Sequence, residues 1–182
     1  MRDPSCWQLT EEVKPIAAEN PEALTAALAD RLHGGNCGEH AQVAFDYLRV
    51  KAVGETINMS AKQGLDHAFV LIGDLPTESD PDIVVADPWP TQATATTWED
   101  HFAYTSDRQQ INVHNSMVAD GQNVKAVIAA GLTLTEKGKQ MAQRTLSDEE
   151  TEQAIQQGLD DDWIWEHEDA AATGHDYEYY SN

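Results

Sequence analysis

Two stretches near the start of the chain carry apolar residues at helical spacing. The first begins at Asn20-Pro21-Glu22, where a capping residue, a proline and an acidic residue mark a helix start, and it ends before Gly34-Gly35. The second begins at about Asn36 or Cys37 and ends at Gly54. The apolar positions are Leu24, Leu28 and Leu32 in the first stretch and Cys37, Ala41, Ala44 and Leu48 in the second. We therefore predict two amphipathic helices joined by a glycine turn.

From Glu55 onward the pattern changes to short runs of branched apolar residues, which are typical of strands. The strongest runs are His67 to Ile72 and Ile83 to Ala86, and a polar, proline-containing loop joins them. Weaker strands are predicted at Thr56 to Met59 and Gln110 to His114, and further helices from Thr10 and over Thr97 to Tyr104, Asn123 to Ala130 and Thr135 to Arg144. The predicted fold class is α+β, with the Cys37 helix packed on an antiparallel sheet.

Composition divides the chain into a folded domain, residues 1–147, and a tail, residues 148–182. The whole chain of 182 residues is long enough to bury one core. The tail holds twelve acidic residues, no lysine or arginine, and several tryptophans and tyrosines. Such a composition favours a frayed helix followed by disorder, whereas the aromatic residues leave docking on the domain or on a basic partner open.

A formal net charge of −21 limits the classes of partner. It opposes binding to nucleic acid and to anionic lipid, and it favours basic proteins, such as an inhibitor or immunity protein. No apolar run approaches the roughly 18 residues that a membrane span needs, and the first residues lack the apolar core of a secretory signal. We expect a soluble protein, whose export would need a specialised route. The two cysteines form no disulfide framework, which suits a reducing compartment.

Three residues in these elements suit thiol chemistry. Cys37 stands at a predicted helix N-terminus, where the helix dipole and unpaired N–H groups favour the thiolate. His67 opens one predicted strand and Asp87 closes the next, so neighbouring strands would bring them together. A nucleophile, a base and a group that orients the base form the expected catalytic set. A buried structural cysteine, a strand histidine and a turn aspartate before proline are the alternatives.

The motifs Gly35-x-Cys37-x-x-x-Ala41, His67-Ala68-Phe69 and Asp87-Pro88 together resemble those of the transglutaminase-like and papain-like cysteine enzymes. With Trp89 following, the pattern is most similar to the glutamine deamidase toxins and effectors of bacteria within that superfamily. The resemblance covers about residues 34–98. It implies a papain-like core, a Cys37–His67–Asp87 triad, and deamidation or transamidation of a glutamine side chain in a host protein.

Members of the superfamily often carry an additional side-chain donor for the oxyanion, upstream of the cysteine. Gln8 and Asn20 are not at the usual short distance, and Asn36 reads as the helix cap. The backbone N–H group of Cys37 is therefore the expected donor, with Asn36, Gly38 and Trp89 as further candidate oxyanion or substrate contacts.

Other functions remain open at this stage. The same triad would serve a papain-like peptidase or an enzyme similar to the arylamine acetyltransferases. A binding module that uses the acidic tail is the alternative from another class. His33, Cys37 and His40, with His67 or Asp87, have ligand-like spacing, but the paired knuckles of a structural zinc site are absent. We therefore expect neither a metal nor another cofactor. No role is assigned to His101 or His114.

Overall fold

The computed structural model describes residues 3–32, 34–88 and 93–143, which form five α-helices and seven strands. The helices are α1 (Lys14–Glu19), α2 (Pro21–Leu32), α3 (Cys37–Lys51), α4 (Val124–Gly131) and α5 (Glu136–Ala142). The strands are β1 (Trp7–Leu9), β2 (Thr56–Lys62), β3 (Ala68–Ile72), β4 (Val84–Asp87), β5 (Thr94–Thr97), β6 (Ile111–Val118) and β7 (Leu132–Leu134). The predicted α+β class is confirmed. Trp89 and the tail from 148 lie outside the described residues.

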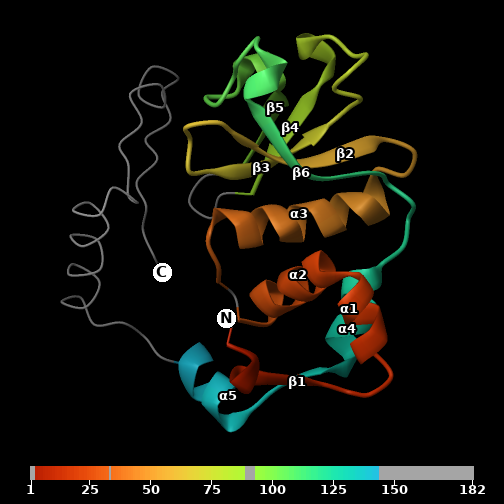
Figure 1. The fold of residues 1–182 in the computed structure, drawn as a ribbon, viewed down its shortest axis with the longest axis vertical. Coiled ribbons are helices and arrows are strands. Elements are labelled where there is room, and N and C mark those ends of the chain that lie inside the picture. Colours follow the sequence, from red (N-terminus) through yellow and green to blue (C-terminus); the bar gives the residue numbers. More distant parts are fainter. Residues whose placement is uncertain (1–2, 33, 89–92, 144–182) are drawn as a thin grey trace, which may run out of the picture.

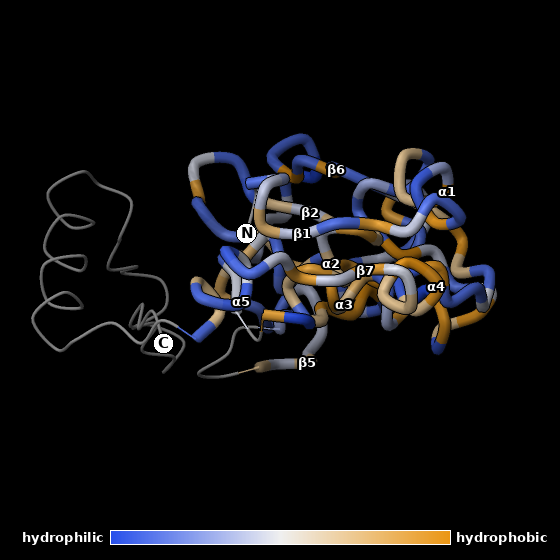
Figure 2. The backbone as a smooth tube through the Cα atoms, turned by 90° about the horizontal axis from the view of Figure 1, so that it is seen from below, coloured by the Kyte–Doolittle hydropathy of each residue, from blue (hydrophilic) through white to orange (hydrophobic). Residues whose placement is uncertain are grey.

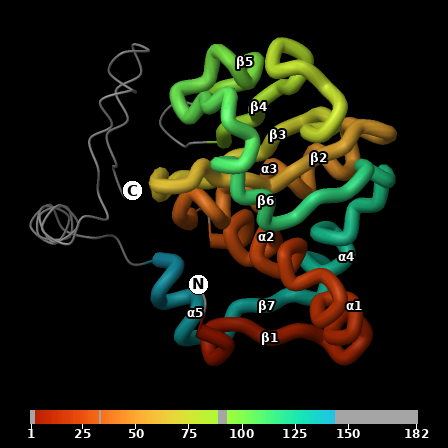
Figure 3. The backbone as a smooth tube through the Cα atoms, turned by 45° about the horizontal axis from the view of Figure 1, so that its top comes forward, coloured from red at the N-terminus to blue at the C-terminus, as the bar shows by residue number. Residues whose placement is uncertain are grey.

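Five strands form one antiparallel sheet in the order β5-β4-β3-β2-β6 (Figure 3). Strands β2 to β5 follow one another as a meander, and β6 returns along the free edge of β2. The pairing of β2 with β6 shifts between Met59 and Ser60, as at a β-bulge. Successive strands with apolar residues on both faces indicate a sheet that is covered on both sides.

Helix α3 covers one face of this sheet (Figure 1). Phe45 from the helix packs there with Ile57 and Val70 from the strands. The opposite face carries Phe69, Leu71, Ile83 and Val85, which pack with Trp98 and Phe102 from the segment after β5. Trp98 has no exposed surface and lies in this core. Side chains of β3 alternate between these two cores, as the pleat of a strand requires.

A second layer lies on the far side of α3 (Figure 1). There α2 packs against both α3 and α4, and hydrophobic residues concentrate on these three helices (Figure 2). The two-stranded β1–β7 sheet closes the layer by pairing Trp7 with Leu134. Helix α5 packs beside it, where Gly138 touches the backbone of Cys6 so closely that an added Cβ would lie 1.9 Å from the carbonyl oxygen. Within the described residues, no helix has the length and apolarity needed to cross a membrane.

Most predicted elements are present, and one is wrong. The helix expected over Thr97 to Tyr104 is replaced by strand β5, a single 3-10 turn at Trp98–Asp100, and irregular chain. Three threonines in Thr94–Thr97 favour an extended backbone, because branching at Cβ suits the pleated sheet. The helical spacing of Trp98 and Phe102 arises instead because both side chains point into the same core. The helix expected from Thr10 begins only at Lys14.

Candidate active site

Cys37 is the first residue of α3, and a capping box fixes the start of this helix. The Oδ1 atom of Asn36 accepts a hydrogen bond from the backbone N–H of Glu39 at 3.1 Å. In return, Oε2 of Glu39 accepts from the backbone N–H of Asn36 at 2.8 Å. The predicted capping role of Asn36 is confirmed, and its side-chain oxygen is committed to that bond.

This capping box leaves two backbone donors beside the thiol. Four N–H groups at a helix start have no acceptor within the helix backbone. The capping box provides acceptors for two of them, the N–H groups of Asn36 and Glu39. The N–H groups of Cys37 and Gly38 have no acceptor among the described residues. The thiol of Cys37 therefore lies next to two open donors at the positive end of the helix dipole, which is where an oxyanion would be stabilised.

Gly35 makes room for the capping box. A Cβ atom at this position would lie 2.7 Å from Cβ of Glu39 and 3.0 Å from its Oε2. Gly34 has no such constraint, because an added Cβ there would meet nothing closer than the carbonyl oxygen of Leu32 at 4.0 Å. The capping box therefore requires a glycine at position 35 but not at position 34.

The antiparallel pairing of β3 and β4 places His67 close to Asp87. Val70 pairs with Ala86, so Asp87 at the end of β4 lies opposite Phe69. His67 lies two residues before Phe69, just outside β3, and alternation along a strand puts it on the side of Phe69. Both side chains are buried, with 5% of His67 and 1% of Asp87 exposed.

The imidazole of His67 joins the carboxylate to the thiol. Its Nε2 lies 2.7 Å from Oδ2 of Asp87. Burial lowers the pKa of His67, but hydrogen bonds to Asp87 and Cys37, together with their charges, outweigh burial and raise the pKa to about 9. Because Asp87 holds Nε2, Nδ1 is the ring nitrogen that remains for Cys37. The structure therefore brings together all three residues of the predicted set, with the histidine between the other two.

Asp87 is held as a carboxylate despite its burial. Burial alone would raise the pKa of Asp87, but hydrogen bonds from His101 and His67 lower it below its ordinary value. A charged Asp87 accepts the Nε2–H of His67, and this fixes the tautomer in which Nδ1 can take a proton from the thiol.

A cavity of about 400 Å³ opens over Cys37. Gly38 and His67 line it together with Gln42, Asp66 and His114. The thiol lies 4.0 Å from the carbonyl oxygen of Asp66 and is only partly buried, so a substrate can reach it. His114, which had no predicted role, belongs to the wall of this cavity. Trp89, expected near the substrate, falls outside the described residues.

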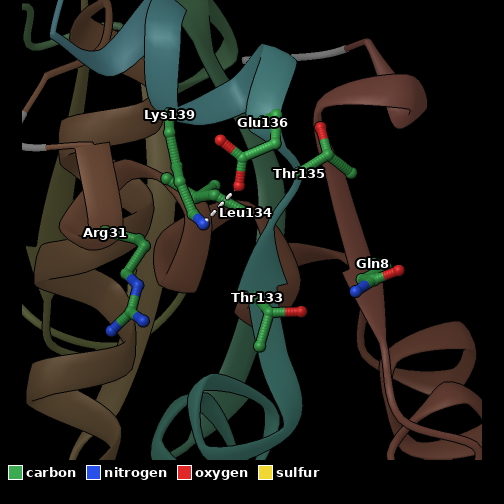
Figure 4. A pocket seen from close by; sticks show the side chains of 7 residues that line it. All are labelled: Gln8, Arg31, Thr133, Leu134, Thr135, Glu136 and Lys139. Atoms are coloured by element: carbon green, nitrogen blue, oxygen red, sulfur yellow. Dashed lines mark hydrogen bonds and ion pairs between the residues drawn. The ribbon is translucent and has the colours of Figure 1, made fainter.

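A second cavity, of about 620 Å³, is larger but lies away from this chemistry. Arg31, Lys139, Glu136 and Thr133 are among its lining residues, and Lys139 pairs with Glu136 at 2.6 Å (Figure 4). Among the described residues, its lining includes no thiol and no imidazole. We therefore locate the candidate active site in the smaller cavity, because its described lining contains a nucleophile and a base, Cys37 and His67.

The other cysteine is structural. Cys6 has no exposed surface and its Sγ lies 3.5 Å from Sδ of Met141. Both cysteines are free thiols. Among the described residues, no three histidine, cysteine, aspartate or glutamate side chains are grouped so that they could hold a metal ion. His33, one candidate zinc ligand from the sequence, is outside that part of the chain.

Sequence reasoning missed His101. Its Nε2 lies 3.2 Å from Oδ2 of Asp87, the same oxygen that His67 contacts, and only 4% of the residue is exposed. A signal was available: His101 stands within the run Trp98 to Ala103, whose apolar members are all buried, and a histidine inside a buried run needs a polar partner.

Comparison of the chain with protein-family models, with curated proteins and with solved structures gave no match.

Proposed function

We propose that this protein is a thiol-dependent acyl-transfer enzyme that deamidates or transamidates a glutamine side chain of a protein. The observation that carries the proposal is that His67, hydrogen-bonded to Asp87, lines the same cavity as Cys37, which stands at the start of a helix with open N–H groups. The resemblance of its three motifs to those of glutamine deamidase toxins supports the choice of substrate. A papain-like core, with α3 as the nucleophile helix on the sheet, is part of the same proposal.

In the first half of the reaction, Nδ1 of His67 takes the proton of Cys37, and the thiolate attacks the carboxamide carbon. The N–H groups of Cys37 and Gly38 bind the oxyanion that forms. The C–N bond then breaks, ammonia leaves with the proton from His67, and a thioester remains on Cys37. Throughout, Asp87 orients the imidazole and stabilises its charged form.

In the second half, water attacks the thioester carbonyl while His67 accepts its proton. The C–S bond breaks, the proton returns to the sulfur of Cys37, and the glutamine has become glutamate. A primary amine in place of water gives a crosslinked or transamidated product. Both outcomes use the same three residues, so the amine concentration at the site decides between them.

The charge of the molecule gives further support for a protein substrate. At −21 the chain attracts basic surfaces over distances of about a Debye length, and a bacterial toxin or effector would meet its target or a basic immunity protein in this way. Delivery into a host or target cell by a specialised secretion system is the setting that the resemblance suggests.

The test uses a blocked peptide with a single glutamine and a cell lysate, each incubated with the full chain. Release of ammonia, together with the mass gain that replacement of NH₂ by OH gives, supports deamidation. An added primary amine should appear in the product if transamidation competes. Cleaved peptides without altered glutamine would favour a cysteine peptidase instead.

Two cysteine variants provide the control. Cys37→Ala is expected to abolish turnover, whereas Cys6→Ala removes the buried thiol and should leave turnover intact in the folded fraction, with a modest loss of stability. Full activity in Cys37→Ala would show that the nucleophile is elsewhere and would overturn the proposal.

A further inference from the structure

His101 and His67 converge on one oxygen of Asp87. The Nε2 atoms of the two rings lie 3.2 Å and 2.7 Å from Oδ2, and all three side chains are buried. The other oxygen, Oδ1, has no hydrogen-bond partner among the described residues. The histidines therefore supply the observed hydrogen bonds that hold the carboxylate in place.

A hydrogen bond from the backbone determines which ring nitrogen of His101 carries the proton. Its Nδ1 accepts a hydrogen bond from the N–H of Ala103 at 3.3 Å, so this nitrogen presents a lone pair. The proton of a neutral imidazole then resides on Nε2, which donates it to Asp87. His101 thus donates its Nε2–H to the carboxylate, and Asp87 is also bonded to Nε2 of His67.

Aromatic contacts hold the ring of His101 in this orientation. The indole of Trp98 stacks on it at 26° with 6.1 Å between ring centroids, and Phe102 and Phe69 lie at 4.5 Å and 5.1 Å. His101 also follows directly after the 3-10 turn Trp98–Asp100, which sets its position in the chain. Burial among rings and a backbone bond leave the imidazole little freedom to leave Asp87.

We propose that His101 is a positioning residue of the active site: its Nε2–H keeps Asp87 charged and directed at Nε2 of His67, and so keeps Nδ1 of His67 facing Cys37. The proposal rests on the proposed function, because it takes the Cys37–His67 pair as the reacting groups. The hydrogen bond from His101 is the largest contribution that lowers the pKa of Asp87, ahead of the bond from His67. His101 does not itself contact the reacting atoms.

The experiment measures the alkylation rate of Cys37 with iodoacetamide over a range of pH, in the wild type and in two variants. His101→Gln keeps an N–H donor near the position of Nε2, and His101→Phe keeps a ring but has no donor. In His101→Phe, Asp87 binds its proton more tightly, so the acid limb of the rate profile should move to higher pH by about one unit, a tenfold change in proton affinity. His101→Gln should follow the wild-type profile.

An unchanged acid limb in a folded His101→Phe would overturn the positioning role, and so would a shift of equal size in both variants. If His101→Phe does not fold, the tautomer in the wild type decides: ¹⁵N NMR should find His101 protonated on Nε2 alone near neutral pH, and a proton on Nδ1 would contradict the proposal.

His67→Gln separates this inference from the proposed function. It should alter the profile whether or not His101 has its role. If His67→Gln leaves the alkylation profile unchanged, the Cys37–His67 pair itself is wrong. If His67→Gln changes the profile and His101→Phe does not, only the positioning role is lost.

Discussion

Replacing His67 by glutamine tests the electrostatics of the site without any knowledge of the substrate. The pKa of His67 rises from 6.5 to about 9, because bonds and charges from Asp87 and Cys37 outweigh burial. At about 1.4 kcal/mol per pH unit, this rise corresponds to about 3 kcal/mol of folding free energy. Since the folded pKa lies above the unfolded one, the stabilisation is complete below about pH 6.5 and is lost as the pH rises through about 9. Glutamine retains a donor for Asp87 but does not titrate.

The assay is urea unfolding at several pH values, followed by tryptophan fluorescence, to which the buried Trp98 contributes. The stability advantage of the wild type over His67→Gln should shrink by about 3 kcal/mol between about pH 6 and about pH 10. His114→Gln is the matched control, because His114 is exposed on β6. The difference in stability between the wild type and this variant should change little with pH. If the free energies of unfolding of the wild type and His67→Gln changed with pH in parallel, the reasoning would be refuted, because the pKa of His67 would then not rise on folding.

Three further outcomes are expected. Gly35→Ala should break the capping box and lower the free energy of unfolding in urea by about 1 kcal/mol, because its Cβ would lie 2.7 Å from the Cβ of the capping glutamate. Gly34→Ala should be tolerated, and equal losses of stability in the two variants would contradict this steric argument. Burial raises the pKa of Asp46 to about 6, so the folded state favours the protonated acid and loses stability as pH rises from about 4 through 6. Asp46→Asn should therefore stabilise the protein by up to about 3 kcal/mol at pH 8 and little at pH 4, and no gain at pH 8 would argue against a buried acid there. Iodoacetamide should modify Cys37 and spare Cys6 in the folded protein, as peptide mass mapping would show, and rapid labelling of Cys6 would contradict its burial.

Local patterns were sufficient to predict the elements that carry the site. The start of α3 follows from its capping residues, and β3 and β4 follow from short apolar runs. Hairpin neighbours in an antiparallel sheet come close in space, so the meeting of His67 and Asp87 could be inferred from their places at the strand ends. These predictions succeeded because each depends on residues that are near one another in the sequence.

Long-range pairings could not be predicted in this way. Strands β1 and β7 have three residues each, and Trp7 pairs with Leu134, which lies near the opposite end of the described chain. Neither strand is long enough to show an alternating pattern by itself. The pairing depends on how α2 and α4 pack, which is a property of the assembled core.

The role of His101 illustrates a different limit. Its partner Asp87 lies on another element, and the segment between them includes β5, which the sequence did not predict. A helix was predicted across Thr97 to Tyr104, and that helix would have pointed His101 elsewhere. The error in secondary structure therefore hid a residue of the site.

The β1–β7 pairing has a consequence for how the protein is made. Cys37, His67, Asp87 and the whole five-stranded sheet have been synthesised once Val118 has left the ribosome. Trp7 to Leu9 must wait for Leu132 to Leu134 before they can pair, and Cys6 must wait for Gly138. A nascent chain can thus bring Cys37 and His67 together early, while the side of α2 that packs on α4 stays uncovered until Val124–Gly131 emerges.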